Sequence, residues 1–151
     1  MAKTSHSAQD AGYSVLSSEH SLFTNAPLGI IVTTPEGRLV SVNPAMARMF
    51  GYDSQDELIE SVNYMITQLY ADPSDREELK RLLRENGEVH NYECRGVHRD
   101  GTIIWVSINV SPLQDNNGTV THYQSFITDI TERKKAEEAL NKQKQIMAQA
   151  E

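Results

Sequence analysis

The chain has 151 residues, 38% of them hydrophobic, and a formal net charge of −7 at pH 7, which predicts one compact domain with extra segments at its ends. The negative charge disfavours binding that depends on neutralising phosphates, so nucleic acid and direct membrane contact are excluded from the expected partners. A single cysteine, Cys94, forms no internal disulfide, and no apolar run reaches the roughly 18 residues that span a bilayer, which favours a cytoplasmic chain.

The first part of the chain predicts a leader, a short helix and a hairpin. Residues 1–12 are small, polar and aperiodic, which is typical of a disordered leader. Residues 13–26 favour an N-terminal flanking helix that ends before Pro27. Residues 29–33 predict a buried strand and residues 38–42 an alternating strand, and the turn residues between them make the pair a hairpin.

The middle of the chain predicts helices. Asn43 is a suitable cap for a short helix that ends at Gly51, and Asp53 or Ser54 begins another. Residues 73–86 carry acidic side chains early, basic side chains late and leucines on one side, which indicates an amphipathic helix.

The last part predicts three antiparallel strands and a helix. The strands cover residues 89–98, 102–113 and 120–129, with turn residues between them, and residues 131–151 lack Gly and Pro and favour an exit helix. The order of elements predicts an α+β fold for residues 27–130, a five-stranded antiparallel sheet with short helices on one face.

Four segments of the chain carry a family resemblance. They are Asn25-Ala26-Pro27-Leu28-Gly29-Ile30, Val42-Asn43-Pro44-Ala45 with Phe50-Gly51-Tyr52, Arg99-Asp100-Gly101 with Trp105, and Asp129-Ile130-Thr131-Glu132-Arg133-Lys134. Their order and spacing over about residues 20–140 resemble the PAS family of sensor modules. The resemblance implies a bacterial signalling role, with a downstream output domain that is a histidine kinase or, next in preference, a diguanylate cyclase. Because the chain lacks a phosphate loop, a nucleophile elbow and a zinc-protease motif, we expect no catalysis from it.

The residues at the start of the exit helix are the expected route of the signal. The resemblance assigns signal transmission to Asp129, Ile130, Thr131 and Arg133. Short polar side chains at a strand-to-helix transition satisfy the first unpaired amides, and we expect Arg133 to pair with Asp129. The alternative is a helix cap without a signalling role.

Specific cofactors of the family have no matching residues here. Flavin adducts need a cysteine where Glu60-Ser61-Val62-Asn63-Tyr64-Met65 stands, and haem needs a ligand from residues 73–86, which contain no histidine. Both groups are therefore disfavoured, no metal site is expected, and no cofactor is evident. Cys94 is expected to be a small core residue, with redox sensing as the less favoured reading.

The inner face of the sheet is the expected place for a ligand. The alternation of Ile104, Val106, Ile108 and Val110 puts them on that face, which predicts either an apolar pocket for a small organic ligand or, preferably, a filled core. The candidate pocket residues are Met46, Met49, Phe50, Tyr64, Met65, Tyr92, Cys94, Val106, Ile108, Tyr123 and Ile127.

The exit helix predicts a homodimer. Its apolar seam repeats at steps of four and three residues, which is typical of a parallel coiled coil that continues beyond the chain; a solvated single helix is the alternative. Leu22 and Phe23 of the flanking helix are expected to cover Trp105 of the same chain or of a partner. The candidate dimer residues are Leu22, Phe23, Trp105, Ala136, Leu140 and Met147. A structural or protein-docking PAS domain without ligand is the competing function.

Overall fold

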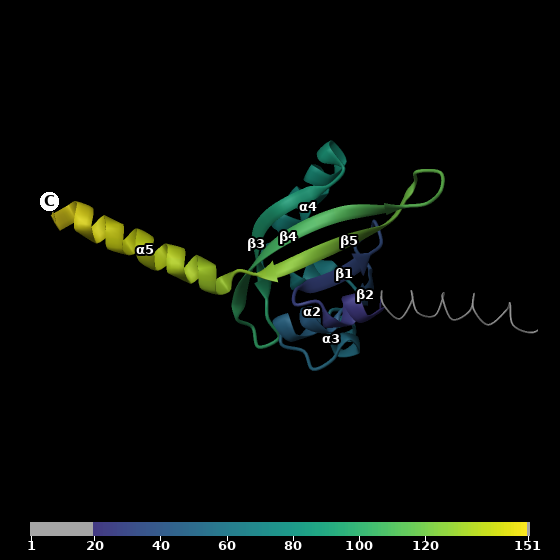
Figure 1. Cartoon of the computed structure of the whole chain (residues 1–151), viewed down its shortest axis with the longest axis horizontal. Coiled ribbons are helices and arrows are strands. Elements are labelled where there is room, and N and C mark those ends of the chain that lie inside the picture. Colours follow the sequence, from purple (N-terminus) through teal and green to yellow (C-terminus); the bar gives the residue numbers. More distant parts are fainter. Residues whose placement is uncertain (1–19, 151) are drawn as a thin grey trace, which may run out of the picture.

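A five-stranded antiparallel sheet in the order β2-β1-β5-β4-β3 forms the centre of the structure (Figure 1). The structure is a computed structural model and describes residues 20–150. The predicted sheet is confirmed, and its strands are β1 (Gly29–Thr33), β2 (Leu39–Val42), β3 (Val89–Val97), β4 (Ile103–Gln114) and β5 (Val120–Asp129).

Short helices cover one face of this sheet, which makes the fold α+β as expected. Their buried side chains join those of the sheet's inner face in one hydrophobic core. These helices are α2 (Pro44–Met49), α3 (Gln55–Ser61), the 3-10 turn η1 (Ile66–Leu69) and α4 (Pro73–Asn86). Residues 20–25 are helical, as predicted for the end of the flanking helix. The predicted leader, residues 1–12, and the first part of that helix lie outside the described residues.

The inner and outer faces of β4 follow the predicted alternation. Ile104, Val106, Ile108 and Val110 are at most 8% exposed, whereas their neighbours in the strand are half-buried or exposed. Successive side chains of a strand point to opposite faces, so a period of two in the sequence marks the buried face. The core therefore lies between this face and the helices.

Helix α4 has the boundaries that its sequence signals predict. The Asp72 side chain accepts a hydrogen bond from the Ser74 amide at 2.9 Å, Pro73 occupies the first turn, and Gly87 ends the helix at φ +80°. Leu79 on its inner side is buried, and Arg81 on its outer side pairs with carboxylates of its own helix. The amphipathic pattern thus matches the structure, with the apolar side toward the core and the charged side toward solvent.

Helix α5 (Thr131–Ala150) extends away from the sheet (Figure 1). Every residue from 135 to 150 is exposed, and the start of the helix contacts the domain at β4 and, through ion pairs with Glu93, at β3. None of the helices within residues 20–150 combines the length and apolarity that crossing a membrane requires.

Asn43 joins three parts of the fold through its side chain, which is fully buried. Its Oδ1 accepts hydrogen bonds from the Ile30 amide of β1 at 2.8 Å and from the Met46 amide of α2 at 3.0 Å. Its Nδ2 donates to the carbonyl oxygens of Phe23 at 3.1 Å and Leu28 at 3.0 Å. An asparagine amide has two acceptor and two donor positions, so its hydrogen-bonding capacity is filled.

Replacing this side chain tests its role. We expect Asn43→Ala to lower the free energy of unfolding by about 3 kcal/mol, because it leaves buried amides and carbonyls without partners. Asn117→Ala, in an exposed turn, is the matched control and should change it by no more than about 0.5 kcal/mol. Urea denaturation measures both, and equal effects of the two substitutions would contradict this role.

Candidate functional site

The predicted pocket on the inner face is almost completely filled. A residual cavity of about 20 Å³ lies there, which has room for about one water molecule rather than for an organic ligand. Among the residues around it are six of the candidate pocket residues, namely Met46, Phe50, Cys94, Val106, Ile108 and Ile127.

The other five candidate pocket residues lie elsewhere. Met49 and Tyr92 are partly buried against the core, and Met65 is half-buried beside Arg38. The expected position of Tyr64 is corrected: its side chain is 41% exposed, and the Arg38 guanidinium lies 5.0 Å from its ring centre. Tyr123 lines a different and larger cavity.

This larger cavity has a volume of about 300 Å³ and lies between α4 and strands β1, β4 and β5. Apolar side chains, among them Ile66 and Val110, form part of its wall. Four hydroxyl-bearing residues also line it, namely Thr33, Tyr70, Tyr123 and Ser125. Three basic side chains of α4 complete the wall, namely Arg76, Lys80 and Arg84. Its volume is at the lower end of the range for small-molecule sites.

The sequence predicted α4 as an amphipathic helix, but its basic side chains were not among the predicted site residues. The signal that could have found them is their regular spacing of four residues, on the side of the helix that carries Leu79 and Leu83. Residues spaced by four lie on one face of a helix.

Cys94 is a buried residue of β3, with 3% of its surface exposed. Burial, and then the negative charge of Asp75, raise the pKa of its thiol to about 12. The neighbouring Tyr92 hydroxyl donates a 2.7 Å hydrogen bond to Asp75 Oδ1, and burial followed by this bond raises the pKa of Tyr92. Both side chains are therefore neutral at physiological pH.

The start of α5 is hydrogen-bonded to the backbone of Trp105 in β4. The Ile130 amide donates to the Trp105 carbonyl oxygen at 2.8 Å, and the Trp105 amide donates to Thr131 Oγ1 at 3.0 Å. Asp129 Oδ1 accepts from the Thr131 amide at 2.9 Å and from the Thr131 hydroxyl at 2.6 Å. These bonds, which we call the junction clasp, connect the end of β5 and the first residue of α5 to β4.

The predicted pairing of Arg133 with Asp129 is wrong. Arg133 forms an ion pair with Glu93 of β3, and Lys134 Nζ lies 2.7 Å from the same carboxylate. Asp129 Oδ1 already accepts two hydrogen bonds from Thr131, whereas Glu93 of β3 lies within reach of both Arg133 and Lys134 in the first turn of α5. Lys134, and then Arg133, hold the pKa of the Glu93 carboxyl below its usual range.

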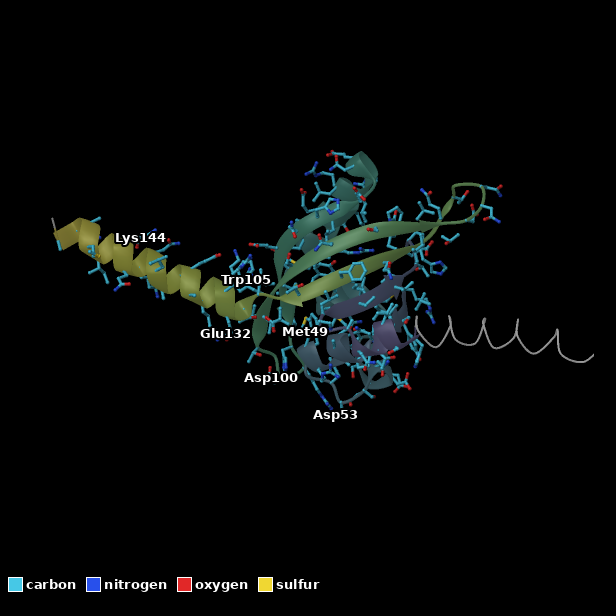
Figure 2. The ribbon with its side chains drawn as sticks, viewed as in Figure 1. Met49, Asp53, Asp100, Trp105, Glu132 and Lys144 are labelled. Carbon is cyan, nitrogen blue, oxygen red and sulfur yellow. The ribbon has the colours of Figure 1, made fainter. Side chains whose placement is uncertain are left out.

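Trp105 lies where α5 leaves the sheet (Figure 2). Its ring is covered by Lys134, whose Nζ lies 4.9 Å from the ring centre. Leu22, which was expected to cover this ring in the same chain or in a partner, is 72% exposed within the chain. Residues 13–19 of the predicted flanking helix lie outside the described residues. Within residues 20–150, no cluster of histidine, cysteine and carboxylate side chains is arranged to hold a metal ion.

Comparisons with known proteins agree with this architecture. The sequence profile of the PAS domain family matches residues 27–132. The sensor histidine kinase TmoS of Ectopseudomonas mendocina is 29% identical over 97% of this chain and 15% of that protein. The Bacterioopsin transcriptional activator of Halobacterium salinarum is 32% identical over 80% of this chain and 18% of that protein. A solved PAS domain of a protein from Colwellia psychrerythraea has a TM-score of 0.66 and 22% identity, over 78% of this chain and 98% of that chain.

The burial of Cys94 predicts an unreactive thiol. At pH 8 we expect iodoacetamide to alkylate native Cys94 slower, by on the order of 100-fold or more, than the surface thiol of an Asn117→Cys variant made in a Cys94→Ala background. Alkylation of Cys94 as fast as that of the surface thiol would contradict this assignment and favour redox sensing.

The neutral buried thiol also stabilises the fold below pH 9, so the free energy of unfolding should fall as the pH rises from 9.0 toward about 12.

Proposed function

The chain belongs to the PAS domain family, and on that premise we propose that it is a sensory and dimerisation module without catalysis of its own. In this proposal, a binding event beside α4 alters the sheet, and the junction clasp passes the alteration to α5 and to an output domain beyond it. The observation that carries the proposal is that β4 and β5 each reach from the larger cavity to the junction clasp.

Strand β5 connects the two places directly. Tyr123 and Ser125 line the cavity, and Asp129 at the end of the same strand holds Thr131. At about 3.4 Å per residue, Ser125 and Thr131 are roughly 20 Å apart along the chain. A change at the cavity therefore has a short, hydrogen-bonded path to α5.

Strand β4 pairs with β5 along this path. Val110 of β4 lines the cavity opposite Ser125, and Val106 pairs with Asp129 next to Trp105. The clasp joins both strands to one helix, so a displacement of β4 against β5 changes the geometry at Thr131. A ligand that favours one such arrangement shifts the population of α5 orientations, which is the form of signal that a downstream domain can detect.

The relatives support an output domain in the same polypeptide. This chain corresponds to 15% of the sensor histidine kinase TmoS and 18% of the Bacterioopsin transcriptional activator. We propose a histidine kinase as the output, with a diguanylate cyclase next. The filled core near Cys94 favours a second candidate function, a structural dimerisation or docking domain that binds no ligand.

The exposed side of α5 supports a homodimer. Leu140 is 51% exposed and Met147 is 66% exposed, and Ala136 precedes them on the same seam. Pairing two copies of this seam removes apolar surface from water. Leu22 and Phe23 remain candidates for contacts with a partner.

Disrupting the seam tests the dimer. We expect Leu140→Glu to shift the chain toward the monomer in sedimentation equilibrium, because the substitution puts a charge into the apolar seam. Gln145→Glu adds the same charge on the opposite side of α5 and should leave the dimer unchanged. A wild-type chain that stays monomeric at every concentration would contradict the dimer.

Transmission is tested in a fusion that joins α5 to the kinase region of a sensor histidine kinase. We expect Thr131→Val to change the autophosphorylation rate by about fivefold or more, because it removes the hydroxyl that links Trp105 to Asp129. Glu132→Gln, at an exposed neighbouring position, is the matched control and should leave the rate unchanged. Equal rates for wild type and Thr131→Val would contradict transmission through the clasp.

A further inference from the structure

The wall that α4 contributes to the larger cavity is basic. Arg76, Lys80 and Arg84 follow one another at intervals of four residues, and all three line the cavity together with Leu79 and Leu83. Positive charges at this spacing repel each other and destabilise a helix by a few tenths of a kcal/mol per pair. A negative charge bound beside these side chains would relieve this repulsion.

No carboxylate of the described residues lines this cavity, although the whole chain carries a net charge of −7. Arg81 holds Glu85, at 2.8 Å, and Glu78 on another side of α4. Glu77 reaches Lys80 at 3.4 Å but is 71% exposed, so this pair lies at the solvent edge. The cavity is therefore a local region of positive charge in an acidic domain.

Arg76 carries a buried donor that has no acceptor. Among the described residues, no hydrogen-bond partner lies within reach of its Nε, and no carboxylate forms an ion pair with its guanidinium. Arg76 as a whole is half-buried, and leaving its buried Nε donor without an acceptor is costly. Gly37 borders this group: a Cβ there would lie 2.9 Å from Arg76 Nη2. Because Gly37 has no side chain, it leaves room for the Arg76 guanidinium.

The remaining walls define what else the ligand must offer. The hydroxyl-bearing residues Thr33, Tyr70, Tyr123 and Ser125 line the cavity from β1, from the residue after η1 and from β5. Ile66 and Val110 provide apolar surface. A volume of about 300 Å³ suits a molecule of roughly the size of a substituted single ring.

We propose that this cavity binds a small organic carboxylate with an apolar body, held by the guanidinium of Arg76. A carboxylate accepts two parallel hydrogen bonds from a guanidinium, which gives Arg76 Nε its missing acceptor. Lys80 and Arg84 add positive charge at the cavity wall, and the apolar body contacts the leucines of α4. The inference rests on the proposed function for its consequence, since binding here supplies the input that the sensory module transmits.

Benzoate is the probe for this site, with the isosteric neutral benzamide as its control. The chain is titrated while the arginine Nε–Hε resonances are followed by NMR, which detects weak binding as well as tight binding. We expect benzoate to shift the Arg76 resonance in a saturable manner and benzamide to leave it unchanged. We further expect Arg76→Gln to weaken benzoate binding by about tenfold or more, measured by calorimetry.

Two further variants separate this site from general charge effects. Arg84→Gln removes an exposed charge at the cavity wall and should weaken benzoate binding without unfolding the chain. Arg81→Gln removes the same charge from the other side of α4 and should leave the affinity unchanged. The proposal is overturned if the Arg76 resonance does not move at saturating benzoate, if benzamide binds equally, or if Arg81→Gln and Arg76→Gln have equal effects. Because these measurements do not involve α5, binding without transmission would overturn only the proposed function.

Discussion

The pairing of β5 with β4 is the constraint on which the rest of this structure depends. β5 is the central strand of the sheet, and its pairing with β4 continues from Val120 to Asp129. The middle of this ladder, at Val110 and Ser125, forms a wall of the cavity beside α4, and the end at Asp129 forms part of the junction clasp. In the function that we propose, the ligand site and the start of the output helix are therefore attached to the same pair of strands, and the strands themselves connect the two places.

The inner face of the sheet is divided into two regions with different chemistry. Around Cys94 and Met46 the side chains fill the space, which stabilises the domain and leaves about 20 Å³. Beside α4 the wall is basic and hydroxylated, and an unpaired donor of Arg76 lies buried there. Apolar packing therefore holds the domain together, while the polar cavity nearby is the site at which we propose that a ligand acts on the strands.

Much of the fold could be predicted from the sequence because its signals are local. The alternation in β4 and the caps of α4 at Asp72 and Gly87 depend on neighbouring residues, and the structure has these elements where the sequence indicates them. The partner of Arg133 was predicted wrongly because Glu93 is distant in the sequence and comes within reach only through the sheet register. The basic side of α4 could not be recognised as a candidate site from the sequence. Its helical spacing shows which residues share a face, but only the fold shows that this face lines a cavity together with Ser125.

The central claim is that an event in the cavity reaches the start of α5, and the amides of Trp105 and Ile130 report on it directly because both donate hydrogen bonds within the junction clasp. The most direct measurement is their hydrogen-exchange rate in the wild-type chain, without benzoate and at saturating benzoate. Our account predicts that benzoate changes the exchange of both amides together with those that border the cavity. A change confined to the cavity, with both amides of the clasp unaffected, would contradict it.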